Sequence, residues 1–247
     1  VSEATGAGLL LEPFLSSAVI ATRVVSLLAR GTQREQLLGA LASGEAIAVL
    51  AHEEAEGWAQ PLATTATPEG KHWRLRGRKS CVLHAPMARW LLVTARTLDG
   101  TGVFVVDRAA DGVRLHAWRS VDGQHAADIE FDILLDDDAR LGDGDAREAL
   151  DEALDRGISA LCADALGVLD RILAATVQYT RDRVQFGTPI GRLQALQHRM
   201  ADMYMQVEQA RSMIYLATSA CLQPDARARR EAVSGAKVIC GEAARKV

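Results

Sequence analysis

The hydrophobic and polar positions divide the chain into stretches with different periodicities. Leu and Ala recur at helical spacing from Glu12 to about Leu41, and the pattern breaks at Gly31-Thr32, where the threonine is a suitable N-cap for a second helix. Short apolar runs bounded by turn residues then follow, and their spacing predicts an antiparallel β-domain. These runs are Ile47 to Ala51, Leu62 to Thr67, His72 to Leu75, Trp90 to Ala95, Gly102 to Val106, Val113 to Trp118 and Ala127 to Leu135.

Helical spacing returns at Ala146 and continues to the end of the chain. One apolar face follows a helix that ends near Arg183, and it consists of Leu150, Leu154, Ile158, Leu161, Leu166, Leu169 and Ile172. A second helix carries an apolar seam of Leu193, Leu196, Met200, Met203, Val207, Ala210, Ile214, Ala217 and Cys221, and a third helix begins near Asp225. The spacing predicts an antiparallel bundle. The methionines of the seam suit subunit packing and an ordinary core equally well.

Helices, then strands, then a bundle predict an α+β fold. We expect an N-terminal helical part at residues 1–45, a β-barrel or β-sheet domain at residues 46–143, and a C-terminal helical bundle at residues 144–247. Val1 is not an initiator methionine, and the chain starts and stops within helical patterns. We therefore expect both ends to be truncated.

Composition narrows the class of protein. A hydrophobic content of 49% is sufficient for a core, and a net charge of −4 argues against a nucleic-acid partner. The cysteines, which have no zinc-site spacing and indicate a reduced, cytoplasmic protein, are Cys81, Cys162, Cys221 and Cys240. The most apolar N-terminal run, from Phe14 to Ala29, contains Arg23 and is too short to span a bilayer, so we expect no membrane association.

The stretch from Arg181 to Met203 joins two predicted helices through a short turn that carries chemically active side chains. Gly187 and Pro189 end the first helix, and Thr188 precedes a proline and is therefore extended. A cation, an aromatic ring and two amides on a rigid bend suit a nucleotide diphosphate, and here they are Arg183, Phe186, Gln185 and Gln194. The alternative is a helix hairpin with an exposed arginine and a buried phenylalanine.

Several other polar groups have structural explanations. Glu53 and Glu54 are adjacent on a strand, so they point to opposite faces and do not form a general acid–base pair. The run Asp136-Asp137-Asp138 lacks calcium-loop spacing and is better explained as a solvated turn. We assign no metal site.

The run YTRDRVQFGTPIGRLQALQHRMADM at residues 179–203 resembles the acyl-CoA dehydrogenase family of flavoproteins. The resemblance extends from Gly31-Thr-Gln to Val247, and it includes the Gly77-Arg-Lys79 turn and the Ala-Asp-Ala-Leu-Gly segment that ends at Gly167. It implies a fold in which FAD lies between the β-domain and the bundle of a tetramer. The implied cofactor-binding residues are Arg183, Phe186, Gln194, Gln185, His52 and Leu83, of which Arg183 and Phe186 would reach the FAD of a neighbouring subunit.

The implied reaction is the removal of two hydrogens across the α and β carbons of an acyl-CoA, with electrons passed to an electron-transfer flavoprotein. The family's usual catalytic Glu aligns beyond Val247, and its alternative position on the first bundle helix is Gly157 here. The neighbouring family Arg aligns with Ile158, although Arg156 lies close by in sequence. The catalytic residue is therefore unknown.

The β-domain also departs from the family pattern. His52-Glu53-Glu54 stands for Thr-Glu-Pro, and Cys81-Val82-Leu83 stands for Trp-Ile-Thr, so Leu83 offers no hydroxyl to a flavin. His52 is either a donor to a flavin oxygen or a solvated residue. Two hypotheses follow: a competent dehydrogenase, or a non-catalytic or half-site subunit of a heteromeric dehydrogenase. A flavin monooxygenase or oxidase on the same fold is a third hypothesis.

Overall fold

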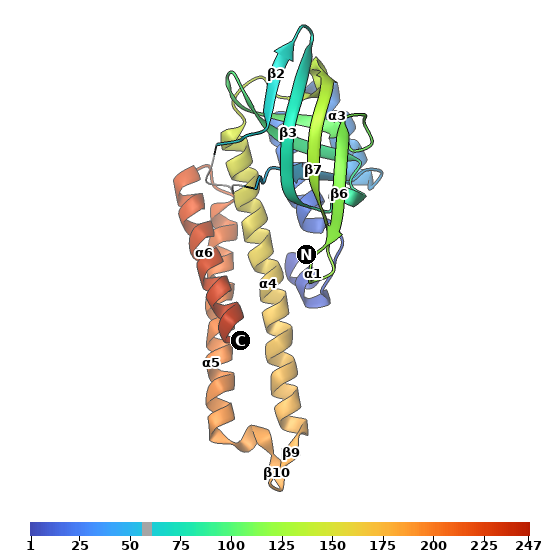
Figure 1. Cartoon of the computed structure of the whole chain (residues 1–247). Helices are drawn as coiled ribbons and strands as arrows, with labels where there is room; N and C mark the ends of the chain where they lie inside the picture. Colours follow the sequence, from blue (N-terminus) through green and yellow to red (C-terminus); the bar gives the residue numbers. More distant parts are fainter. Residues whose placement is uncertain (56–60) are drawn as a thin grey trace. The chain divides into compact units, whose positions relative to one another are not determined.

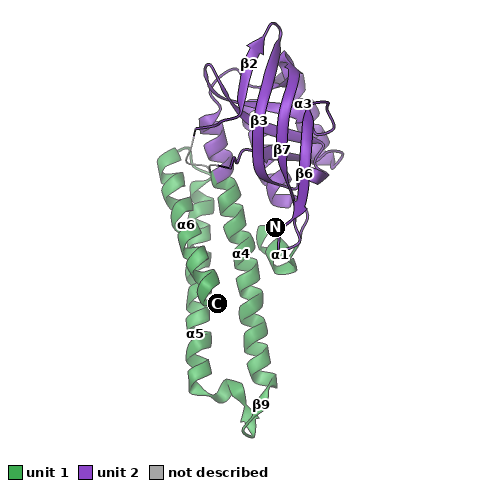
Figure 2. Ribbon diagram, viewed as in Figure 1, with its two compact units in different colours: residues 1–10, 155–247 green, residues 11–154 purple. Residues whose placement is uncertain are grey.

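The structure is a computed structural model that describes residues 1–55 and 61–247. Two compact units divide the chain (Figure 2). The β unit comprises residues 11–154, and the helical unit comprises residues 1–10 and 155–247. The strands of the β unit and the long helices of the helical unit confirm the predicted α+β class.

An eight-stranded sheet forms most of the β unit (Figure 1). The strand order is β6-β7-β3-β2-β4-β5-β8, and β1 pairs with β4 outside this path. Each of the predicted apolar runs overlaps one of the first seven strands. The strands are β1 (Ala48–Ala51), β2 (Thr65–Glu69), β3 (His72–Leu83), β4 (Trp90–Thr97), β5 (Gly100–Asp107), β6 (Val113–Arg119), β7 (His125–Asp136) and β8 (Arg140–Leu141).

The sheet is mixed, so the prediction of an antiparallel domain is wrong for β4. This strand pairs in parallel with β1, where Ala48 lies opposite Trp90, and with the start of β2, where Thr65 lies opposite Arg96. The chain passes through β2 and β3 between β1 and β4, and this crossover lets β4 run in the same direction as β1. The other strand pairs are antiparallel.

The sheet is buried on both faces around β4, which explains the uninterrupted apolar run there. Leu91 and Val93 face one core with Phe104, whereas Leu92 and Val103 face a second core on the other side. The second core is closed by the segments η1 (Phe14–Ala21), α2 (Thr22–Leu28) and α3 (Gly31–Ser43). The residue that precedes the first helical residue of α3 is Arg30, so the prediction that Thr32 is the N-cap is wrong.

His84 fastens the N-terminal part of the β unit to the turn after β3. Its Nδ1 lies 2.9 Å from Ser16 Oγ, and its Nε2 lies 3.1 Å from the carbonyl oxygen of Leu11. A carbonyl only accepts, so Nε2 carries the proton and Nδ1 accepts from the serine hydroxyl. Burial lowers the pKa of His84, which favours this neutral ring.

The helical unit contains three long helices. These are α4 (Arg147–Asp182), which begins in the β unit, α5 (Gln194–Ala220) and α6 (Ala226–Lys246), joined by the short strands β9 (Val184–Gln185) and β10 (Thr188–Pro189) and the turn η4 (Ile190–Arg192). The Asp225 side chain accepts from the amides of Arg227 and Ala228 and caps α6, which confirms the predicted start of the third helix.

The predicted apolar faces of the bundle are only partly buried. Leu166 and Leu169 of α4 are buried, but Leu161 and Ile172 are 52% and 41% exposed, so their assignment to the buried face is wrong. A core-facing stripe follows a period of 3.6 residues, and these two residues lie outside it. On α5 the seam is buried from Val207 to Ala217, whereas its first residue, Leu193, is 40% exposed.

The short helix α1 (Ser2–Gly8) packs very closely against α4. A Cβ added at Gly167 would lie 2.0 Å from the carbonyl oxygen of Glu3, and one added at Gly6 would lie 1.8 Å from that of Asp164. Thr5 Oγ1 donates to Asp164 Oδ1 at 2.8 Å. Glycine is therefore required at both positions because backbone occupies the space of a side chain.

Candidate functional site

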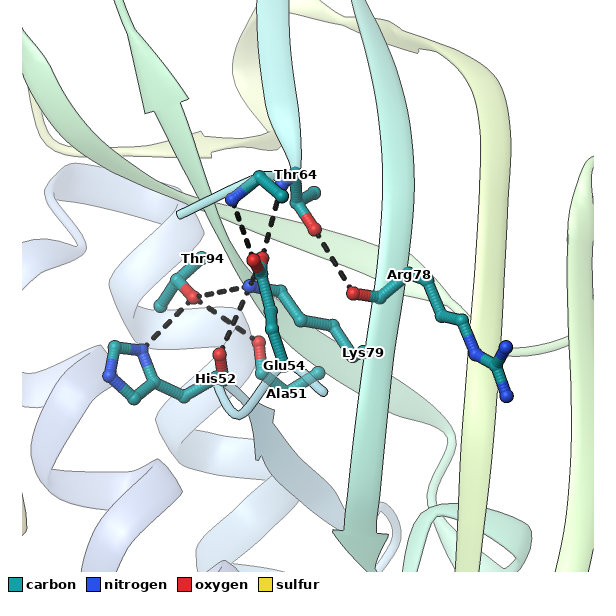
Figure 3. Close-up of polar contacts among 8 residues, drawn as sticks. Ala51, His52, Glu54, Thr64, Arg78, Lys79 and Thr94 are labelled. Carbon is teal, nitrogen blue, oxygen red and sulfur yellow. Dashed lines mark hydrogen bonds and ion pairs between the residues drawn. The ribbon is translucent and has the colours of Figure 1, made fainter. Parts of the chain in front are cut away.

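A buried polar cluster lies where β1 ends and β3 and β4 pass beside it (Figure 3). Alternate residues of β3 face the interior of the β unit. Lys79 is on the same face as Leu75, because the direction of the side chains repeats every two residues along a strand. Lys79 and Thr94, the contribution of β4, are fully buried. His52 and Glu54 come from the segment that follows β1.

The ammonium group of Lys79 uses all of its protons. Nζ donates to the carbonyl oxygen of His52 at 3.1 Å, to Glu54 Oε1 at 2.7 Å and to Thr94 Oγ1 at 3.1 Å. Three acceptors require three N–H donors, so the geometry corresponds to the charged form. Burial lowers the pKa of Lys79, and the neighbouring carboxylate of Glu54 opposes that effect.

Glu54, which follows β1, accepts hydrogen bonds from the two residues that precede β2. Its Oε2 accepts from the amide of Ala63 at 2.6 Å, and its Oε1 accepts from the amide of Thr64 at 3.1 Å as well as from Lys79. Burial acts to raise the pKa of Glu54, but the hydrogen bonds from Lys79, from the Ala63 amide and from the Thr64 side chain outweigh it and lower the pKa to about 2. Glu53 is exposed whereas the Glu54 side chain is buried, but both residues follow the end of β1 at Ala51, so their predicted placement on a strand is wrong.

His52 connects this cluster to a cavity of about 600 Å³ in the β unit. The ring Nδ1 lies 3.1 Å from Thr94 Oγ1, and His52 is one of the residues that line the cavity. Burial and then the charge of Lys79 lower the pKa of His52, while Glu53, Glu54 and Asp151 act in the opposite direction. The ring is therefore neutral near pH 7.

The turn between α4 and α5 is a two-residue β-hairpin. Gln185 pairs with Thr188, and the two central residues, Phe186 and Gly187, have φ values of 54° and 76°. Positive φ at both central residues is the geometry of a type I′ turn, but it is unusual for a bulky side chain. The Phe186 ring is 92% exposed, which argues against the alternative of a buried phenylalanine.

The other residues expected at this corner lie on the same hairpin or beside it. Arg183 follows the last residue of α4, and Gln194 is the first residue of α5. Both are exposed, and within residues 1–55 and 61–247 the Arg183 guanidinium forms no ion pair. The corner thus displays a free cation, an aromatic ring and amides, and we define Arg183, Gln185, Phe186 and Gln194 as the corner set.

The remaining predicted positions are separate from the corner in sequence. Leu83 is the last residue of β3, and its side chain is 39% exposed. Gly157 is a buried position of α4, and Ile158 follows it on the same helix. In the part of the chain that is described, no group of three or more His, Cys, Asp or Glu residues has the arrangement of a metal site.

Sequence reasoning missed Lys79, Glu54 and Thr94 as a connected group. A signal for Lys79 was present, because a lysine in register with Leu75 on the inner face of a strand must have a buried partner. The sequence carried no comparable signal for Thr94, whose contact with His52 depends on how β4 pairs beside β1.

Family models match most of the chain. The acyl-CoA dehydrogenase middle-domain model matches residues 53–134, and the C-terminal-domain model matches residues 145–247. The chain belongs to the acyl-CoA dehydrogenase family. Members of this family are FAD flavoproteins, and the matched residues include the Arg183–Gln194 corner and the Gly77-Arg-Lys79 segment, which lies within strand β3 and not in a turn.

Individual relatives agree with this assignment. The probable acyl-CoA dehydrogenase FadE25 of Mycobacterium tuberculosis is 31% identical over 209 residues, which cover 79% of this chain and 54% of that protein. The ChsE4–ChsE5 complex of Mycobacterium tuberculosis has a TM-score of 0.87 at 28% identity, and the match covers 100% of this chain and 65% of that chain. The Tcur3481–Tcur3483 steroid ACAD has a TM-score of 0.86 at 30% identity over 99% and 65% of the two chains.

This acyl-CoA dehydrogenase family chain spans about half the length of the FadE25 relative. Its described helices include none that is long and apolar enough to cross a bilayer.

Proposed function

We propose that the protein containing this chain is an FAD-dependent acyl-CoA dehydrogenase that introduces an α,β double bond into an acyl-CoA thioester. Electrons then pass to an electron-transfer flavoprotein, and the active assembly is a homo- or hetero-oligomer, most simply a tetramer. The observation that carries the proposal is the corner set, which presents a free guanidinium and an exposed aromatic ring on a rigid hairpin.

The side chains of the corner set suit the diphosphate half of FAD. Arg183 offers a planar fork of donors to phosphate oxygens, and Phe186 offers an apolar face to a ring or a ribose edge. The strained φ of Phe186 supports a binding role, because such conformations persist where function requires a side chain in a fixed position. Gln185 and Gln194 add amide donors and acceptors.

The β unit suits the flavin half in part. His52 brings a neutral imidazole to the edge of the cavity, whereas Leu83 cannot donate a hydrogen bond. When bound, FAD supplies the acceptor for two electrons. The residues assigned in this chain bind and orient FAD. We assign the removal of the substrate's α proton to a carboxylate outside these 247 residues, because Gly157, which stands at the alternative position of the family's catalytic Glu, has no side chain.

Flavin binding tests the proposal directly. The purified full-length protein is expected to be yellow, and its flavin absorbance is expected to bleach anaerobically on addition of an acyl-CoA. A preparation that remains colourless after incubation with FAD and refolding would refute the proposal. Arg183→Ala is expected to weaken FAD binding, and Arg181→Ala, an exposed neighbour on the last turn of α4, is the matched control.

A half-site subunit is the second candidate. It is favoured by Gly157 and Leu83 and by structural similarity to the ChsE4–ChsE5 complex, while the corner set is retained. In this case the chain serves a partner's FAD and has no complete active site of its own. Co-expression with a candidate partner subunit is expected to give a stable complex with about one FAD per pair. A homotetramer with four flavins would exclude it.

A further inference from the structure

We propose that Lys79 and Thr94 are positioning residues that hold the His52 ring with its proton on Nε2, so that the ring presents a hydrogen-bond donor to the cavity. The natural acceptor is the carbonyl-type oxygen of a flat heterocycle such as a flavin. This inference rests on the proposed function for the identity of that ligand, but the state of the ring is a property of the β unit alone.

The hydrogen bonds at the Thr94 hydroxyl decide which nitrogen of His52 carries the proton. Its hydroxyl oxygen accepts one hydrogen bond from Lys79, because an ammonium group can only donate. The single hydroxyl proton then has two possible acceptors, His52 Nδ1 at 3.1 Å and the carbonyl oxygen of Ala51 at 3.4 Å. The shorter contact favours donation to Nδ1.

The charge of Lys79 favours the same choice. A donor to a hydroxyl oxygen polarises the O–H bond and makes that hydroxyl a stronger donor, so the chain from Lys79 through Thr94 to His52 is cooperative. A fixed cation behind Thr94 also favours a lone pair, rather than an N–H dipole, on the ring nitrogen that faces it. A neutral imidazole that accepts at Nδ1 must carry its proton on Nε2.

The geometry directs that proton away from the cluster. Figure 3 shows Nδ1 facing Thr94 and the other ring nitrogen on the edge turned away from it. Thr94 and Lys79 are fully buried, whereas His52 is only partly buried and lines the cavity. Lys79 also bonds the His52 carbonyl oxygen, so the backbone and the ring of His52 are fixed by the same ammonium group.

The ring state can be measured by NMR on the chain labelled with ¹⁵N-histidine. Protonated and unprotonated ring nitrogens have well separated ¹⁵N shifts, and a His52→Gln sample assigns the signals. The expected result is a single neutral tautomer with hydrogen on Nε2. A ring with its hydrogen on Nδ1 would overturn the proposal.

Variants separate positioning from mere structural support. Lys79→Met is expected to give a mixture of the two tautomers and a higher His52 pKa, because the neighbouring cation is gone. Should that variant not fold, Lys79→Met with Glu54→Gln removes both members of the buried pair and allows the same measurement. Thr64→Val is the matched control, because Thr64 is a buried hydroxyl of the same cluster that donates to the Arg78 carbonyl oxygen. An unchanged tautomer and pKa in the Lys79 variants would refute the role of Lys79.

A separate arm tests the ligand. His52→Phe is expected to lower the FAD affinity of the full-length protein several-fold and to shift its visible flavin spectrum, and His52→Gln, which retains a donor, is expected to restore part of both. The predicted tautomer together with a protein that binds no FAD would refute the proposed function and leave the positioning role intact. FAD binding that is insensitive to His52→Phe would refute the assignment of the ring as the donor to flavin.

Discussion

Replacing Lys79 with methionine tests whether the buried cluster stabilises the β unit. The substitution removes a charge-assisted hydrogen bond to Glu54 and two further bonds to His52 and Thr94. With net values of about 1.5–3 kcal/mol for the bond to the carboxylate and about 1 kcal/mol for each of the others, the expected loss in unfolding free energy is about 3.5–5 kcal/mol. Removal of one partner from a buried ion pair costs a similar amount, about 3–5 kcal/mol, because the remaining charge is left uncompensated.

Urea unfolding at pH 7, followed by tryptophan fluorescence, measures this loss. Trp73, Trp90 and Trp118 lie on strands β3, β4 and β6, so their fluorescence reports on the β unit. Arg78→Met is the matched control, because Arg78 is the neighbouring residue on β3 and its ion pair with Asp128 is on the surface. The control is expected to lose less than about 1 kcal/mol. A Lys79 variant as stable as this control would refute the reasoning.

The same variant has a pH signature. The folded-state pKa of Glu54 is about 2, below the ordinary value of 4.5, so the carboxylate stabilises the fold above pH 4.5 and this contribution is lost as the pH falls toward 2. A difference of that size corresponds to about 3 kcal/mol. Lys79→Met removes one cause of the lowered pKa, so the difference in unfolding free energy between wild type and variant is expected to shrink between pH 4.5 and pH 3.

Three further predictions concern other parts of the chain. Gly167→Ala is expected to destabilise the helical unit, seen as a lower melting temperature by circular dichroism, because its methyl group would overlap the Glu3 carbonyl; a neutral effect would contradict the close packing. The pKa of His84 is lowered by burial, so stability is expected to fall as the pH drops below about 6.5, where the unfolded ring takes up a proton first; His84→Gln is expected to flatten this slope in urea titrations at pH 5 and pH 7.5. Arg183→Ala is expected to weaken FAD binding about tenfold or more in fluorescence titrations of the full-length protein, whereas Arg181→Ala leaves it unchanged.

Most elements of the fold were predictable because their periodicities are local. The strands were predicted where apolar residues cluster, yet β3 was predicted only to Leu75, although it continues to Leu83. Its second half alternates arginines with Gly77 and Lys79, so the inner face does not look apolar. The parallel pairing of β1 with β4 was also missed, because it depends on the path of the chain between them.

The candidate site was predictable where its residues are neighbours in sequence, and not where the fold joins them. Gly187 indicated a turn, but a bulky residue at positive φ has no sequence signal, so the exposure of Phe186 emerged only from the hairpin.

The pair Glu53-Glu54 is a second case in which the local sequence predicts only part of the arrangement. Alternation along an extended segment predicts that the two acids point apart, but it does not say which of them is buried. Lys79 decides this, 25 residues further along the chain, because its buried ammonium group requires a carboxylate and Glu54 supplies one. The Lys79 ammonium group is in turn held in place by the His52 carbonyl and the Thr94 hydroxyl. Glu54, Lys79 and the His52 ring therefore form one cooperative unit. A buried charge in such a register is therefore the feature from which the rest of the site can be worked out.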